Sequence, residues 1–75
     1  MAVDPVRVTP HACFETANGE QRMVVRITDS DTVVYVKREK GAEERWCKTN
    51  HSPARLSFAF LVDHEIDCPN YPMGR

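Results

Sequence analysis

Alternating hydrophobic and polar positions mark two adjacent stretches in the first half of the chain. In residues 21–29, Met23, Val25 and Ile27 share one side of an extended chain, and arginine, valine and threonine occupy the other side. Residues 32–39 repeat the alternation and are rich in β-branched side chains. The polar link "DSD" between the two stretches favours a bulged or slightly longer connection. The pattern therefore predicts two long strands that pair as an antiparallel hairpin.

Polar turn signals flank this hairpin on both sides. Residues 16–20 contain Asn-Gly, which accepts positive φ at low cost, so they predict a tight turn after a first strand at 11–15. Residues 40–44 form a second polar turn with a glycine, and 45–49 form a short strand centred on Trp46. Short strands at intervals of about 10 residues are typical of a small barrel or sandwich.

The apolar segment in the last third of the chain fits two patterns. Residues 55–62 alternate as a strand would, with Leu56 and Phe58 on one side. However, Ser52 is a good N-cap, and Pro53 would occupy the first helical position, where its missing N–H costs nothing. We favour a helix over about residues 53–64 because the start signal is the more specific of the two. A strand remains the alternative, and in both cases we expect a core segment.

These elements predict a single, mainly β domain with a short C-terminal helix. Residues 1–10 hold Pro5 and Pro10 and are expected to form an extended arm, residues 11–68 the domain, and the proline-containing residues 69–75 a loose tail. The expected architecture is a small SH3-like or meander barrel of roughly four to five antiparallel strands. A chain of 75 residues buries only a modest core, so dimerisation is an expectation from size alone.

One resemblance supports this architecture. The stretch "GEQRMVVRITDSDTVVYVKREKG", followed by Trp46 and then "SPARLSFAFLV", resembles a plan found in small, mostly uncharacterised bacterial proteins with SH3-like barrels. The likeness covers about residues 12–63. It implies a fold and no particular activity, because such barrels serve in ribosomal, RNA-binding, peptide-binding and scaffolding roles. It transfers no functional residues to this chain.

The uneven charge of the chain suggests a contact surface for an anionic partner. The net charge is −1, but residues 22–55 hold eight Lys or Arg against five Asp or Glu, a net of +3. This excess is mild for a nucleic-acid binder, and interleaved glutamates weaken its field. Basic side chains would contact phosphates and two aromatic rings would stack on bases, unless the rings belong to the core. The candidate residues are Arg22, Arg26, Lys37, Arg38, Lys40, Arg45, Lys48, Tyr35 and Trp46.

The cysteines predict free thiols and a cytoplasmic location. There are three of them, an odd number without a Cys-x-x-Cys pair, which is a poor match to a disulfide framework. The first ten residues lack the regions of a signal peptide, and no apolar run approaches the roughly 18 residues of a membrane span. We therefore expect a protein in a reducing compartment, with no membrane partner.

Cysteine and histidine spacing raises the alternative of a small zinc-binding domain. Cys47-x₃-His51 and His64-x₃-Cys68 have suitable ligands, but a helix between them would hold the two histidines about 20 Å apart. A four-ligand site from these pairs is therefore disfavoured, and no cofactor is expected. If a metal binds at all, the rearranged set is His11, Cys13, His64 and Cys68.

The sequence thus predicts a non-catalytic interaction module of bacterial or phage type. Its expected partner is an unknown protein or a second copy of the chain, bound through a sheet face or by self-association. Binding of RNA or DNA is the first alternative and zinc binding the second. No enzymatic activity, catalytic residue or small-molecule substrate is expected. Cys13 lies near His11 and Cys47 near His51 in the sequence, but a catalytic thiol also needs an orienting third group and a pocket, and a domain of this size has little volume for a pocket.

Overall fold

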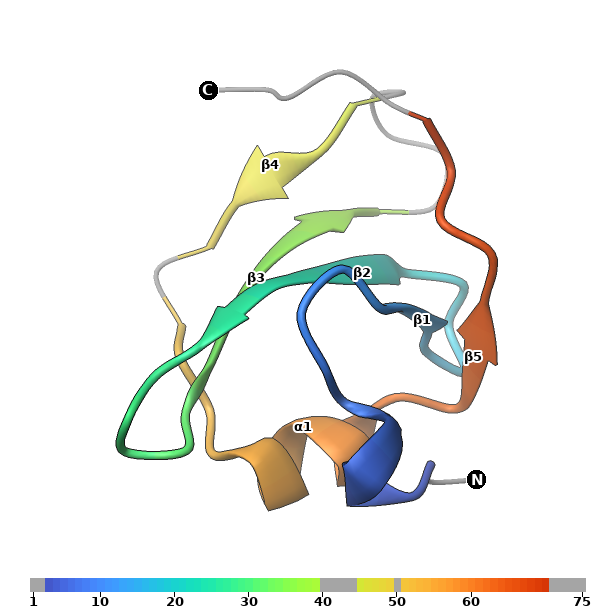
Figure 1. Cartoon of the computed structure of the whole chain (residues 1–75). Helices are drawn as coiled ribbons and strands as arrows, with labels where there is room; N and C mark the ends of the chain where they lie inside the picture. Colours follow the sequence, from blue (N-terminus) through green and yellow to red (C-terminus); the bar gives the residue numbers. More distant parts are fainter. Residues whose placement is uncertain (1–2, 40–44, 50, 71–75) are drawn as a thin grey trace.

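The fold is mainly β, with one short α-helix (Figure 1). The computed structural model describes residues 3–39, 45–49 and 51–70. Within them the strands pair antiparallel in a single sheet with the order β4-β3-β2-β1-β5. The elements in chain order are the 3₁₀ helix η1 (Pro5–Arg7), β1 (Cys13–Glu15), β2 (Gln21–Ile27), β3 (Val33–Arg38), β4 (Cys47–Lys48), α1 (Arg55–Leu61) and β5 (His64–Ile66).

The Asn-Gly turn joins β1 to β2 as predicted. Gly19 has φ of 87°, a value that glycine adopts without the steric cost that a Cβ atom brings. Its N–H donates to the carbonyl of Thr16 at 2.9 Å, and the Thr16 N–H donates to the Glu20 carbonyl at 2.8 Å. These bonds close the turn and set the register in which Cys13 lies opposite Met23.

The predicted long hairpin is confirmed as β2 and β3. The Thr28 N–H donates to the Thr32 carbonyl at 2.9 Å, and Asp31 takes a positive φ of 61°, which aspartate tolerates better than most residues. The irregularity lies in β2, where the register shifts between Val24 and Arg26. A bulge of this kind bends and twists the strand that carries it.

The sheet is open in the part of the chain that the structure describes, so the expected barrel is not formed there. β4 lies at one edge of the sheet and β5 at the other, with no pairing between them. β5 was not predicted, because the expected helix continued to residue 64 and a tail followed. It pairs with β1 so that Ile66 lies opposite Cys13 and His64 opposite Glu15. A three-residue strand with a partner 51 residues away leaves little periodic signal in the sequence.

The helix is confirmed, but it is shorter than predicted and begins later. α1 spans seven residues, and its N-cap is Ala54, which makes no side-chain capping bond, in place of Ser52. The cause is the segment before it, which pairs with the β2–β3 turn: the Val33 N–H donates to the Pro53 carbonyl at 2.7 Å. Ala54 also forms a bridge with Thr32. Pro53 is therefore held outside the helix.

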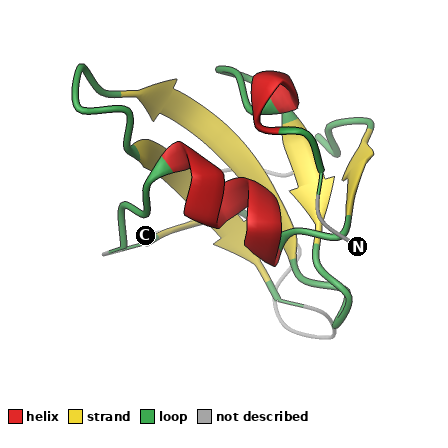
Figure 2. Ribbon diagram, turned by 90° about the horizontal axis from the view of Figure 1, so that it is seen from below, coloured by secondary structure: helices red, strands yellow, loops and turns green. Residues whose placement is uncertain are grey.

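The N-terminal segment is part of the domain and not an extended arm. Asp4 caps η1 by accepting from the Val6 N–H at 3.0 Å, and Val8 is fully buried. The Val3 N–H donates to the carbonyl of Ala59 in α1 at 3.1 Å. Figures 1 and 2 show η1 beside α1, both under the same face of the sheet.

Buried side chains form a cluster on each face of the sheet. On the helix side, the Phe58 ring meets Phe14 with centroids 5.7 Å apart and Tyr35 with centroids 5.1 Å apart. Cys13 and Val36, the strand neighbours of Phe14 and Tyr35, point to the opposite face because side chains alternate along a strand. Trp46 joins this second, smaller cluster.

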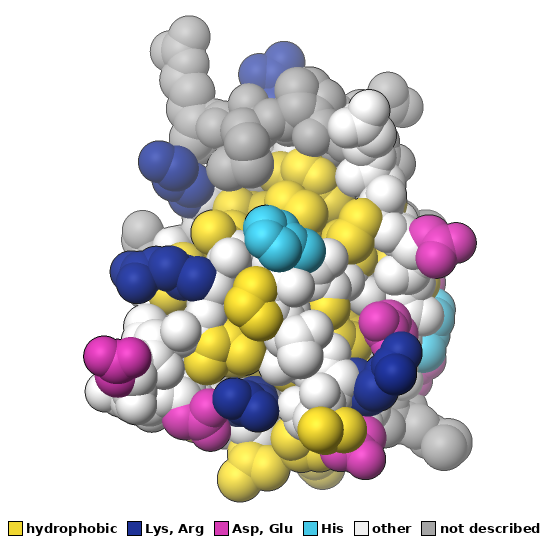
Figure 3. Space-filling model, in the orientation of Figure 1, with side chains coloured by type: hydrophobic (Ala, Val, Ile, Leu, Met, Phe, Trp, Pro, Cys, Tyr) yellow, Lys and Arg dark blue, Asp and Glu magenta, His cyan; other side chains and the backbone are white. Residues whose placement is uncertain are grey.

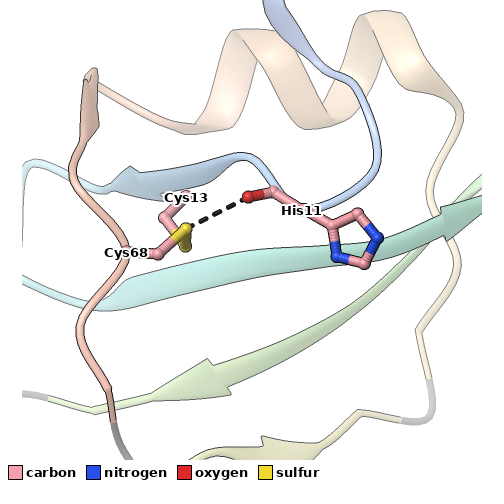
Figure 4. Close-up of a disulfide and its surroundings, with 3 residues drawn as sticks. All are labelled: His11, Cys13 and Cys68. Carbon is pink, nitrogen blue, oxygen red and sulfur yellow. Dashed lines mark hydrogen bonds between the residues drawn. A yellow bond between two sulfur atoms is a disulfide. The ribbon is translucent and has the colours of Figure 1, made fainter.

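A disulfide joins Cys13 to Cys68, 55 residues later, so the expectation of free thiols is wrong for these two residues. Figure 4 shows it linking β1 to the segment after β5, with the Cys68 Sγ 3.1 Å from the carbonyl oxygen of His11. Cys47 keeps a free thiol. Disulfides persist in oxidising environments, so cysteine usage no longer supports the cytoplasmic prediction. Within the described ranges, no helix has the length and apolar character needed to cross a membrane.

Candidate functional site

The predicted basic surface does not form a single patch. Arg22 and Lys37 lie opposite each other across β2 and β3, on the face that carries Tyr35 and α1. Three others lie on the opposite face: Arg26 of β2 pairs with Val34, Arg38 of β3 with Gln21, and Lys48 of β4 with Val36. Arg45 is exposed and precedes β4, and Lys40 lies outside the described residues. Figure 3 shows basic, acidic and apolar side chains interspersed over one face of the molecule.

The two basic residues on the helix side are engaged within the fold. The Arg22 Nε donates to Glu20 Oε1 at 2.5 Å, and the guanidinium carbon lies 5.1 Å from the centroid of the Tyr35 ring. Only 15% of the Arg22 side chain is exposed. The Lys37 Nζ lies 3.8 Å from the other oxygen of Glu20 and 3.4 Å from Glu39. Arg22 therefore covers the aromatic core, and neither charge is left to attract a phosphate by itself.

The two aromatic residues proposed for base stacking lie in the core. Tyr35 is 6% exposed and Trp46 is 2% exposed. Base stacking needs an open ring face, so the stacking role is corrected here to a packing role. Both rings belong to the core, which was the alternative interpretation of the sequence.

The rearranged zinc set is also corrected. Cys13 and Cys68 are bonded to each other, and a metal-bound cysteine must be a thiolate. His64 instead lies between carboxylates, with its Nδ1 2.9 Å from Asp63 and its Nε2 3.4 Å from Glu15. Among the residues that the structure describes, no group of three or more His, Cys, Asp or Glu side chains is placed to hold a metal ion.

The most unusual surface of the molecule is the outer side of α1. Leu56 and Phe60 are one helical turn apart and are 69% and 76% exposed, and Leu61 beside them is 56% exposed. On the inner side, Phe58 and Ala59 are fully buried. At about 100° per residue, the two sets occupy opposite sides of the helix. α1 is therefore apolar on both sides, a property typical of helices that are covered on both sides.

η1 extends this surface. Val6 is 67% exposed, and η1 lies in contact with α1, next to the bond from Val3 to Ala59. We call the set Val6, Leu56, Phe60 and Leu61 the α1 surface. In Figure 2 the molecule is seen from the side of α1, and in Figure 3 hydrophobic side chains protrude at the lower end, where Figure 1 places α1 and η1.

Arginines next to the α1 surface form ion pairs with carboxylates. Arg7, which follows Val6, donates to Glu65 of β5 at 2.6 Å. Arg55, which precedes Leu56, lies 2.8 Å from Asp31. Each cation beside the apolar side chains thus has its own carboxylate. The α1 surface consequently has an apolar centre, and two ion pairs lie at its border.

Sequence reasoning missed this surface because it assigned the whole segment to the core. The signal was present: "RLSFAFL" has apolar residues at almost every position, so a helix that rests on one face of a sheet must leave some of them outside. The expected residues of a contact surface were charged, whereas those that the fold exposes together are aliphatic and aromatic.

No family model, curated protein or solved structure matches this chain. The resemblance to SH3-like barrels stays a prediction, and the open sheet gives it no support. The geometry of the α1 surface is therefore the basis on which a function is inferred.

Proposed function

We propose that this protein is a non-catalytic interaction module that binds another protein surface through the α1 surface. The observation that carries the proposal is the pair Leu56 and Phe60, which are more than two-thirds exposed on the same side of a seven-residue helix. Scattered exposed apolar residues are ordinary on proteins, but a group of them on adjoining elements is typical of a contact site.

The gain from covering these side chains is large for so small a domain. Fully burying a leucine, valine or phenylalanine side chain contributes about 1.5 to 3 kcal/mol. Phe60 and Leu56 would act as anchors in the partner, with Leu61 and Val6 excluding water around them. The balanced ion pairs of Arg7 and Arg55 would form the polar border that such interfaces commonly have.

Nucleic-acid binding has less support than protein binding. Five of the basic residues are divided between the two faces of the sheet, and both aromatic rings are buried. A polarisation titration with single-stranded and duplex oligonucleotides at low and at physiological salt tests this alternative. Salt-dependent binding that survives changes in the α1 surface would favour it over the proposal.

Site-specific photo-cross-linking tests the proposal directly. A benzophenone amino acid is placed at Phe60 in one version of the chain and at Val25 in another, since Val25 is an exposed apolar residue of β2 that does not belong to the α1 surface. In cells that express the protein, irradiation should give a defined protein adduct from position 60 and none from position 25. Equal labelling at both positions, or no adduct at position 60, would contradict the proposal.

A further inference from the structure

The ion pairs at the border of the α1 surface, and its limited area, are consistent with one kind of partner. Resting on the proposed function above, we infer that the partner is a second copy of the same chain, whose own α1 surface packs against the first across a twofold axis. Each copy would supply Val6, Leu56, Phe60 and Leu61, so the two sides of the interface are identical in composition.

The charge around the α1 surface favours a self-complementary contact. Arg7 is paired with Glu65 and Arg55 with Asp31, so these four side chains add no net charge to the border. Asp4, which precedes η1, adds a further exposed carboxylate. An anionic lipid surface requires a basic excess next to the apolar side chains, and this border lacks one. Two copies, by contrast, would meet through borders whose ion pairs are neutral, with Asp4 as one additional carboxylate on each copy.

The area of the α1 surface sets the expected strength of the dimer. Four side chains that each expose more than half of their surface offer about 100 Å² apiece, or roughly 800 Å² of apolar area in a pair of copies. This lies below the ~1,200 Å² at which stable interfaces begin. The dimer should therefore be weak and reversible.

The spacing on α1 suits an antiparallel arrangement of the two helices. Leu56 and Phe60 are separated by one turn, so a twofold axis between them would place Phe60 of one copy against Leu56 of the partner subunit, and the reverse. Ser57 is exposed between these residues in sequence and lies on the same outer side. A small side chain there allows the two helices to approach closely.

Sedimentation velocity tests whether the protein dimerises. The weight-average mass should rise from 8.6 kDa toward twice that value as the concentration increases from about 1 μM to about 1 mM. Phe60→Glu should hold the protein at the monomer mass over this range, because it would place two carboxylates in the interface. The matched control Val25→Glu adds the same charge on β2 and should dimerise as the wild type does. Far-ultraviolet circular dichroism checks that both variants are folded.

Ser57→Cys tests whether the two α1 helices pack against each other in the dimer. Ser57→Cys, in a chain whose free thiol is removed by Cys47→Ser, should form a disulfide-linked dimer under mild oxidation. Phe60→Glu should abolish this cross-link. Ser30→Cys, at an exposed position in the β2–β3 turn, is the matched control and should give little dimer.

These experiments distinguish a failure of the dimer from a failure of the proposed interaction module. A monomer mass at 1 mM together with no cross-link at position 57 would overturn the dimer. If the benzophenone at position 60 then captures a different protein, the interaction module stands and its partner is a different chain. Sedimentation with neutral phosphatidylcholine vesicles that is lost in Phe60→Glu would also overturn the dimer, in favour of a lipid surface.

Discussion

Cys13, the first residue of β1, is covalently joined to Cys68, which lies two residues after the end of β5. The same two segments are paired in the sheet, where Cys13 lies opposite Ile66. β5 is a short edge strand, and such strands are weak by themselves. The disulfide therefore secures an edge strand that pairs with β1 through only three residues.

The number of reactive thiols is the first test of this arrangement. Denatured but unreduced protein should react with one equivalent of iodoacetamide, at Cys47, and reduction should expose the two further thiols. Intact-mass spectrometry before and after alkylation counts them. Three alkylated residues in the unreduced chain would support the original expectation of free thiols and contradict the bond.

Reduction should destabilise the fold substantially. In the chain-entropy account, a link between residues 55 positions apart stabilises the folded state by about 4 kcal/mol. Urea denaturation with and without a phosphine reductant should show the midpoint fall, and Cys13→Ala with Cys68→Ala should behave like the reduced protein. Cys47→Ser serves as the control and should keep the wild-type midpoint. An unchanged midpoint on reduction would mean that β5 holds its place without the bond.

Replacing each of two phenylalanines in α1 by alanine should destabilise the fold to very different extents. Phe58→Ala removes a fully buried ring that contacts Phe14 and Tyr35, and should cost about 3 to 5 kcal/mol in the free energy of unfolding. Phe60→Ala removes an exposed ring and should cost less than about 1 kcal/mol in the monomer. Chemical denaturation at low micromolar concentration measures both. Similar losses at the two positions would contradict the assigned orientation of the helix.

The β1–β2 turn depends on its glycine. Gly19→Ala should destabilise the protein by about 1 kcal/mol, because a Cβ atom is disfavoured at a φ of 87°. Gly19→Asn should be tolerated better, since asparagine adopts this conformation more readily than alanine does. Thermal unfolding monitored by circular dichroism compares the two variants. Equal effects would indicate that the turn accepts another conformation.

Local signals in the sequence predicted the local parts of the fold. Asn-Gly at 18–19 predicted the first turn, and alternation over 21–29 and 32–39 predicted the long hairpin, because each depends on residues close together in the chain. The start of α1 was misplaced because Pro53 is held by the backbone of Val33, a contact that the sequence around Pro53 does not reveal.

The parts that sequence reasoning missed depend on distant contacts. β5 and the disulfide both require that the end of the chain return to β1, and neither has a local pattern. The basic residues were expected to form one surface because they are close in sequence, but strand alternation distributes them over two faces. The α1 surface could be found only when the inner side of the helix was known from its contacts with the sheet.

The link between Cys13 and Cys68 also determines how the molecule would bear a mechanical load. A tensile force applied to the two ends of the chain would run through the sulfur–sulfur bond and bypass all the residues between the two cysteines. Only the segments outside the bond could lengthen, so β2, β3 and the aromatic core would remain folded under tension. Single-molecule pulling should show a short extension in the oxidised protein, and an unfolding step of the enclosed residues only after reduction.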